Sequence, residues 1–177
     1  MNICVFCASR DNLDPAYEMA AAELGRQMAN ENHTLIYGGG MVGLMGVVAR
    51  ATHEGGGRVV GVIPKRLRTR EIAYEGADEL IETATMTERK EVMIHRSDAF
   101  VVLPGGFGTL DELIETVTLY HLGYHNKPTI LINVAGFFDP VLALFEHFYA
   151  TNVAYPRYAE AYHVVQTPGE ALSLLGA

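Results

Sequence analysis

The sequence predicts an α/β fold in which helices cover both faces of one parallel sheet. Short apolar runs alternate with amphipathic helical patterns along the 177 residues, and this alternation is typical of strand–helix–strand units with right-handed crossovers. The strand-like runs are continuously apolar, as expected of strands buried on both faces. No linker or internal repeat interrupts the pattern, so we expect a single doubly wound domain over residues 1–177 with a mostly parallel sheet.

The bounds of the elements follow from these patterns. The expected strands are residues 2–7, 34–37, 58–63, 79–82, 99–103, 129–133 and 163–166. The expected helices are residues 15–32, 44–54, 87–97, 110–122, 140–151 and 168–175. Asp14 and Pro15 predict a capped helix start, with proline at the first helical position, and Thr87 is the expected N-cap of the third helix.

Composition excludes several classes of protein. The net charge of −8 argues against a nucleic-acid partner, because duplex binding needs clustered cations. No run approaches the ~18 apolar residues of a membrane span, and no charged leader precedes the first strand, so we expect no membrane partner and a cytoplasmic location. Cys4 and Cys7 form a C-x-x-C motif. Residues three apart in a strand point to opposite faces, so we expect two buried thiols rather than a redox pair.

Residues 104–112, with the sequence Pro-Gly-Gly-Phe-Gly-Thr-Leu-Asp-Glu, carry the strongest functional signal. They join an expected strand to an expected helix. Glycines let backbone N–H groups approach a ligand closely, and a helix N-terminus adds partial positive charge, so this loop predicts an anion site, most simply for a phosphate. Glu112 makes no favourable contact with such an anion, and we therefore expect it to serve the chemistry.

Two further loops are expected at the same edge of the sheet. Residues 8–10 follow the first strand and residues 38–43 follow the second. In open α/β sheets ligands bind at the carboxyl ends of the strands, so these loops and residues 104–109 predict one cleft. Ser9, Gly39 and Gly40 are the candidate phosphate or cleft residues in these loops.

Several other motifs are incomplete. Residues 38–43 have the spacing G-x-G-x-x-G, but the tip of the next strand, residues 63–66, has no acid for a ribose, which leaves an NADP site as a minor alternative. Leu44 and Met45 replace the Lys-Ser/Thr pair of a nucleoside triphosphate loop. No G-x-S-x-G elbow is present. His121 and His125 are separated by a turn and no cysteine cluster accompanies them, so we predict no metal and no cofactor.

Two basic segments have alternative interpretations. Residues 65–70 hold four of the 13 basic residues and are either a solvated loop or a flap that brings cations to a phosphate. Arg89 and Lys90 are expected in the first turn of a helix, where the dipole favours acids. A local rule broken in this way indicates a functional role, against the simpler alternative of two exposed cations.

Taken together, these motifs resemble the LONELY GUY family of cytokinin riboside 5′-monophosphate phosphoribohydrolases, often mislabelled lysine decarboxylases. The resemblance rests on Pro104-Gly-Gly-x-Gly-Thr-x-x-Glu112, on Tyr37-Gly-Gly-Gly40 and Gly43-Leu-Met-Gly46, on Gly61-Val-Ile-Pro-Lys65 and on Arg89-Lys90. It implies a Rossmann-like fold and hydrolysis of the N-glycosidic bond of adenosine 5′-monophosphate-type nucleotides. It also implies a homodimer with the site near the interface. No lysine stands out as a Schiff-base site for decarboxylation.

The resemblance also implies roles for individual residues. Arg89 and Glu112 correspond to the catalytic pair of the family. The implied substrate-binding residues are Glu75, Lys90, Gly105, Gly106, Gly108, Thr109 and Thr118, and Glu115 joins them because it lies on the same helix stripe as Glu112 and Thr118. A carboxylate beside the anomeric carbon would stabilise an oxocarbenium-like transition state, and Arg89 would orient it. The alternative is a nucleotide or molybdenum-cofactor carrier of the same fold that lacks hydrolase activity.

Overall fold

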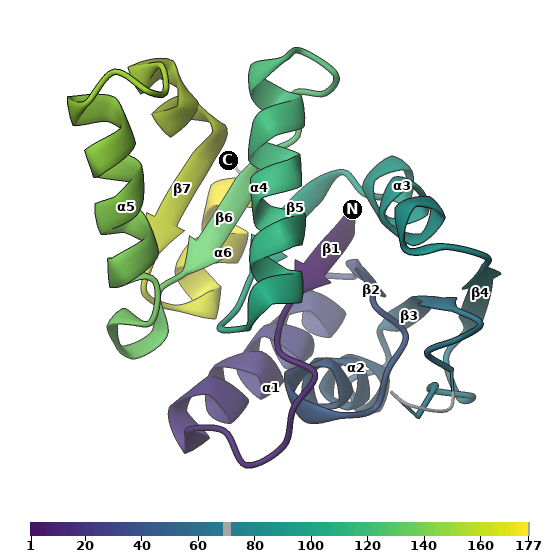
Figure 1. Ribbon diagram of the computed structural model, residues 1–177. Coiled ribbons are helices and arrows are strands. Elements are labelled where there is room, and N and C mark those ends of the chain that lie inside the picture. The colour runs from purple at the N-terminus through teal and green to yellow at the C-terminus, as the bar shows by residue number, and fades with distance from the viewer. Residues whose placement is uncertain (69–71, 177) are drawn as a thin grey trace.

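The computed structural model describes residues 1–68 and 72–176, which include one seven-stranded parallel sheet. All six pairs of neighbouring strands run parallel, in the order β4-β3-β2-β1-β5-β6-β7. The central strands β1 and β5 are visible behind helix α4 in Figure 1. The strands are β1 (Asn2–Phe6), β2 (Thr34–Tyr37), β3 (Arg58–Pro64), β4 (Glu79–Thr83), β5 (Ala99–Val102), β6 (Thr129–Ile132) and β7 (Tyr162–Val165).

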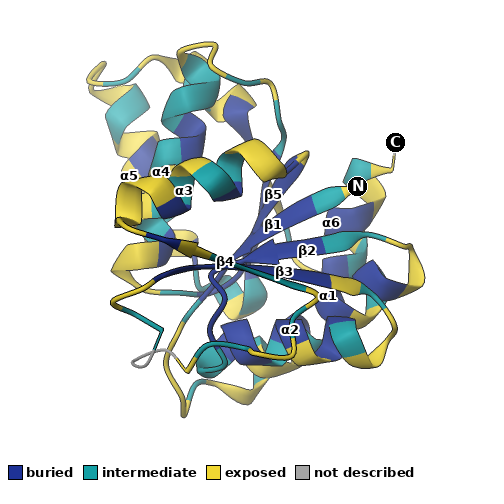
Figure 2. Ribbon diagram, turned by 90° about the vertical axis from the view of Figure 1, so that its right-hand side faces the viewer, coloured by how far each residue is buried: buried dark blue, intermediate teal, exposed yellow. Residues whose placement is uncertain are grey.

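Helices cover both faces of this sheet. The α-helices are α1 (Pro15–Asn30), α2 (Gly43–Glu54), α3 (Met86–Arg96), α4 (Phe107–His121), α5 (Asp139–Ala150) and α6 (Pro168–Leu175), and two short 3₁₀ helices are η1 (Val134–Gly136) and η2 (Pro156–Ala161). Figure 2 shows the buried strands between α1, α2 and α6 on one side and α3, α4 and α5 on the other. This arrangement confirms the predicted α/β class with a doubly wound parallel sheet.

Each face of the sheet has its own apolar core. On one face, Ile3 and Val5 of β1 pack with Leu24 of α1 and Val48 of α2. On the other face, Cys4 of the same strand packs with residues of α3 and α4. Because successive strand residues point to opposite faces, a continuously apolar strand is what a sheet with two covered faces requires. Cys4 and Cys7 lie in opposite cores as free buried thiols, as predicted.

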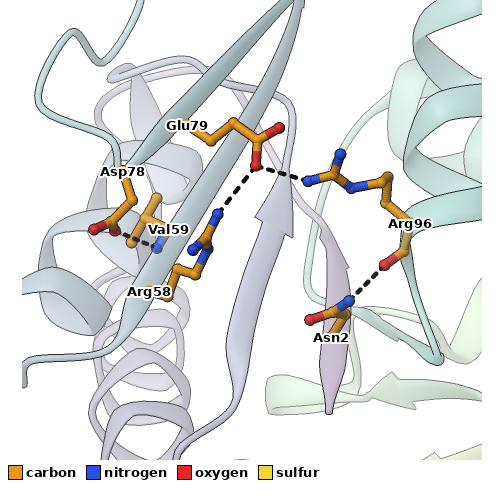
Figure 3. Close-up of polar contacts among 6 residues, drawn as sticks. All are labelled: Asn2, Arg58, Val59, Asp78, Glu79 and Arg96. Atoms are coloured by element: carbon orange, nitrogen blue, oxygen red, sulfur yellow. Dashed lines mark hydrogen bonds and ion pairs between the residues drawn. The ribbon is translucent and has the colours of Figure 1, made fainter.

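At the edge of the sheet where the strands begin, polar contacts join β1, β3, β4 and α3 (Figure 3). Glu79 at the start of β4 accepts hydrogen bonds from Arg58 Nη2 of β3 at 3.1 Å and from Arg96 Nη2 of α3 at 2.7 Å. These donors, with the Arg96 guanidinium first, lower the pKa of Glu79. Asn2 Nδ2 donates to the Arg96 carbonyl oxygen at 3.0 Å. The ion pairs of this edge therefore join β3 to β4 and β4 to α3, and the opposite edge holds the candidate site.

The predicted strand bounds lie within one residue of the observed ones at each end. The helix α1 begins as predicted, because Asp14 Oδ1 accepts the Ala16 N–H at 2.8 Å. Two helix starts were predicted wrongly. Helix α4 begins at Phe107 rather than residue 110, and Thr85 rather than Thr87 caps α3, since Thr85 Oγ1 accepts the Glu88 N–H at 3.1 Å.

The corrected start of α3 changes the interpretation of its cations. Glu88 occupies the first turn, and its carboxylate accepts the Ala84 N–H at 2.7 Å. The acid that the helix dipole favours is therefore present, and Arg89 and Lys90 lie beyond it. The expectation that cations occupy the first turn was wrong. Any role for Arg89 has to be argued from its contacts.

Candidate functional site

The loops that follow β1 and β5 meet at the carboxyl edge of the sheet. The Ala8 N–H donates to the Pro104 carbonyl oxygen at 3.1 Å, and the Met45 N–H of α2 donates to the Ala8 carbonyl oxygen at 3.3 Å. The order of the strands reverses at β1. The chain adds β2, β3 and β4 on one side of β1 and then β5, β6 and β7 on the other. A cleft of about 1030 Å³ opens above the meeting point. Ligands bind at such switch points in open α/β sheets.

The glycine-rich loop after β5 leads directly into α4 and forms one wall of the cleft. Thr109 is buried and packs so closely on Gly105 that a Cβ at Gly105 would overlap its hydroxyl. At Gly106 and Gly108, in contrast, no atom lies within 4 Å of an added Cβ. Gly106 is the N-cap of α4 and no side chain caps this helix. The first N–H groups of α4 are thus not satisfied by a capping side chain, and the space beside Gly106 and Gly108 is open.

Arg89 reaches the cleft from α3 and is held by two strands. Its side chain is 6% exposed, although arginine is rarely buried in proteins. Arg89 Nε donates to the Val62 carbonyl oxygen and Nη2 donates to the Gly38 carbonyl oxygen, both at 3.1 Å. A Cβ at Gly38 would overlap the guanidinium. The glycine is required here because Arg89 occupies the space that a side chain would fill.

Glu112 lines the same cleft from the second turn of α4. Burial raises the pKa of the Cys7 thiol, and the negative charge of Glu112 raises it further while the positive charge of Arg89 lowers it. Both charged groups therefore lie close to the end of β1. The structure brings together the two residues that the sequence singled out for chemistry, one from each side of the central strand.

A shallower groove of about 600 Å³ runs along α4 beside the cleft. Lys90 Nζ lies 3.0 Å from Asp111 Oδ2 and 3.1 Å from Glu115 Oε2. Burial alone would lower the pKa of Lys90, but the two carboxylates outweigh it and the net shift is upward. Thr118 lines the same groove. The predicted binding residues Lys90, Glu115 and Thr118 are therefore grouped next to the cleft rather than inside it.

Three predicted residues lie outside both hollows. Glu75 accepts two hydrogen bonds from Arg68 Nη2, at 2.8 and 2.9 Å, and Arg68 also pairs with Glu82. The Gly39 carbonyl oxygen accepts the Tyr74 N–H, and Gly40 forms an isolated bridge with Ala73. These contacts fold the connection between β3 and β4 back onto the loop after β2. Thr69 and Arg70, part of the predicted basic flap, lie outside the described residues.

The predicted site residues thus fall into three groups. The residues that line the cleft are Ser9, Arg89, Gly105, Gly106, Gly108, Thr109 and Glu112. Sequence reasoning missed an aromatic and apolar part of the wall, where Tyr17 and Phe137 meet edge to face with ring centroids 5.5 Å apart. Phe137 follows β6, so the rule that ligands sit at the carboxyl ends of strands contained the signal for it. Arg10 also lines the cleft and was not selected.

Residues 1–68 and 72–176 contain neither a cluster of metal-ligating side chains nor a membrane-spanning helix. In this part of the chain, no three side chains among histidine, cysteine, aspartate and glutamate are grouped as a metal site would require. None of the helices there is long and apolar enough to cross a membrane.

The fold, with a ligand cleft at the carboxyl ends of its central strands, is that of the Rossmann-like α/β proteins. A family model described as "Possible lysine decarboxylase" matches residues 45–175. The "Probable cytokinin riboside 5′-monophosphate phosphoribohydrolase LOGL2" of Oryza sativa subsp. japonica is 42% identical over 173 residues, which are 98% of this chain and 71% of that protein. The "Cytokinin riboside 5′-monophosphate phosphoribohydrolase LOG2" of Arabidopsis thaliana is 47% identical over 144 residues, with 81% and 68% covered.

This chain belongs to the LONELY GUY family and is an enzyme of the phosphoribohydrolase class. Among solved structures, the molybdenum cofactor binding protein of Rippkaea orientalis superposes with a TM-score of 0.76 at 22% identity, covering 99% of this chain and 94% of that one. The molybdenum cofactor carrier protein of Chlamydomonas reinhardtii superposes with a TM-score of 0.75 at 21% identity, covering 99% and 95%. At these identities the likeness shows the fold alone.

Proposed function

We propose that this protein hydrolyses the N-glycosidic bond of adenosine 5′-monophosphate-type nucleotides, including cytokinin riboside 5′-monophosphates, to the free base and ribose 5-phosphate. The observation that carries the proposal is the meeting of Arg89 and Glu112 in one cleft beside the open glycine loop. Curated relatives at 42–47% identity are named for the same reaction on cytokinin riboside 5′-monophosphates.

In this reaction the bond between C1′ and the base nitrogen breaks and a water oxygen bonds to C1′. Positive charge develops on C1′ and the ring oxygen in the transition state. Glu112 stabilises this charge, and Arg89 orients Glu112 and the nucleotide. The base leaves with a proton that balances the one lost by the water. The glycine loop, with Gly105, Gly106, Gly108 and Thr109, binds the phosphate through backbone N–H groups.

The remaining assignments belong to the same proposal. Ser9, Gly39 and Gly40 border the phosphate region. Glu75, Lys90, Glu115 and Thr118 contribute to substrate binding from the edge of the cleft, and for Glu75 this requires release from Arg68. The chain acts as one domain, and its two free thiols fit a reducing, cytoplasmic location.

A direct assay tests the hydrolase. The protein is incubated with AMP, with its N6-isopentenyl analogue and with other nucleoside monophosphates, and the products are separated by liquid chromatography. We expect free adenine or free N6-isopentenyladenine together with ribose 5-phosphate in equal amounts. Binding of these nucleotides without release of base would favour the carrier alternative and remove the hydrolase.

We further propose a homodimer with the site near its interface. Exposed apolar side chains follow the outer side of α4, where Phe107 is 94% exposed and Ile114 is 43% exposed, and both line the groove beside the cleft. Residues seven apart lie on one face of a helix, so Phe107 and Ile114, with Leu110 between them, form an apolar stripe beside Asp111 and Glu115. Such stripes are typical of protein interfaces.

Ile114→Glu is expected to convert the dimer to a monomer and to reduce turnover, because the charge would be buried without a partner in the interface. Sedimentation velocity at micromolar concentration measures the change. Leu144→Glu is the matched control, since Leu144 is 48% exposed and lies on α5, away from the stripe. A dimer that persists in Ile114→Glu, or a native protein that sediments as a monomer, contradicts the proposed interface.

A further inference from the structure

Arg10 lies at the edge of the cleft on a backbone that is held from two sides. The Ala8 N–H is bound to Pro104 on the β5 side. On the other side Asp11 Oδ1 accepts the Gly43 N–H at 3.1 Å. Gly43 has a φ of +61° and approaches so closely that a Cβ on it would lie 2.6 Å from the Arg10 nitrogen. This loop therefore presents the Arg10 side chain from a fixed backbone.

The two arginines that line the cleft differ in what holds their guanidinium groups. Arg89 is buried and donates to the carbonyl oxygens of Val62 in β3 and of Gly38, the residue that follows β2. Arg10 is exposed, and within residues 1–68 and 72–176 its guanidinium takes part in no hydrogen bond or ion pair. All five of its N–H donors therefore remain available to a ligand.

Charge shows why such a group matters here. The protein carries a net charge of −8, and one of its carboxylates, that of Glu112, lies in the wall of the cleft. A phosphate monoester brings almost two further negative charges at neutral pH. Backbone N–H groups supply only partial charge, and Arg89 is already committed to carbonyl oxygens. Arg10 is the other arginine that lines the cleft, and it carries a full positive charge.

We propose that Arg10 is the residue that selects nucleoside monophosphates over nucleosides, by pairing with the 5′-phosphate as the substrate enters the cleft. The inference rests on the proposed function and adds to it the origin of the preference for a phosphorylated substrate. A guanidinium fits a phosphate because its planar fork makes two parallel hydrogen bonds to the oxygens. Arg10 touches a part of the substrate that does not react, so it contributes binding rather than chemistry.

The test compares Arg10→Gln with the native protein on AMP and on adenosine. We expect KM for AMP to rise roughly 10- to 100-fold, with kcat changed less than about threefold, because uniform binding is lost. The rate on adenosine should not change. Arg10→Lys should recover part of the loss, since it restores the charge without the fork. Arg26→Gln is the matched control, because Arg26 is exposed on α1 and lies outside the cleft.

The outcomes separate this inference from the proposed reaction. An unchanged KM for AMP in Arg10→Gln, or a fall in kcat alone, overturns the role of Arg10 and leaves the hydrolase intact. If the native protein releases no base, calorimetric titration with AMP and with adenosine replaces the kinetics. A loss of AMP binding in Arg10→Gln with native affinity for adenosine then supports the inference although the reaction has failed, and equal binding of AMP by both proteins overturns it.

Discussion

Glu112→Gln is expected to lower turnover of AMP-type nucleotides by roughly 10³-fold or more while the protein still binds the nucleotide. The amide keeps the size of the side chain and removes the negative charge that the proposed mechanism places beside the anomeric carbon. Since that charge matters most in the transition state, kcat should fall much more than the affinity for AMP. Steady-state kinetics and calorimetric titration with AMP measure the two effects separately.

Glu146→Gln serves as the control for this substitution. Glu146 is exposed on α5 and lines neither the cleft nor the groove. It should show native turnover and native thermal stability. Turnover in Glu112→Gln within threefold of native would exclude Glu112 from the mechanism, whatever the affinity for AMP.

Gly38→Ala is expected to produce a folded protein with turnover reduced by roughly 10²-fold, an effect transmitted through Arg89. The added methyl group would overlap the guanidinium, and Arg89 Nη2 would lose its acceptor at Gly38. Moving a buried arginine off its hydrogen bonds should also destabilise the protein, by about 1–3 kcal/mol. Kinetics and denaturant unfolding of the same preparation give both numbers.

Gly169→Ala in α6 is the matched control, because an added Cβ there would meet its nearest atoms only at ordinary contact distances of 3.7 and 3.8 Å. It should change neither turnover nor stability appreciably. Native kinetics in Gly38→Ala would mean that the Arg89 guanidinium can leave Gly38 without consequence. The account of how Arg89 is positioned would then be wrong.

The sheet was predictable because its strands are apolar on both faces. The runs at residues 34–37 and 99–103, for example, are each bounded by a polar residue before and by glycine or proline after, and no helical period fits them. Helix starts were less predictable where function and local propensity conflict. The glycines at positions 106 and 108 predict a loop, whereas Gly108 lies inside α4. Leaving the start of α4 rich in glycine weakens the helix and opens its N-terminus, and this is a feature that propensity alone does not reveal.

The sequence predicted those parts of the candidate site that consist of glycine-rich loops and charged residues. Arg89 and Glu112, which line the cleft, were selected from the sequence. The need for glycine at position 38 was not predicted, because the contact between Gly38 and Arg89 joins residues 51 positions apart. Tyr17 and Phe137 were missed for the same reason, since an apolar side chain in a helix or after a strand looks like core until the chain is folded. The role of Glu75 in substrate binding stays a prediction, and its pairing with Arg68 could not be predicted because it depends on the path of a connection without helical or strand pattern.

Arg89 is hydrogen-bonded to β3 and to the residue after β2, whereas Glu112 lies on α4, the helix that follows β5. The two residues therefore belong to opposite sides of β1 in the sheet. The hydrogen-bond ladders between these strands fix the distance between the elements that carry the two side chains. Both apolar cores cross from one half of the sheet to the other, since Leu35 and Val101 share one core and Ile36 and Phe100 share the second. The packing that holds the halves together therefore also keeps Arg89 and Glu112 in one cleft, and we expect activity and circular dichroism to be lost over the same temperature range on heating.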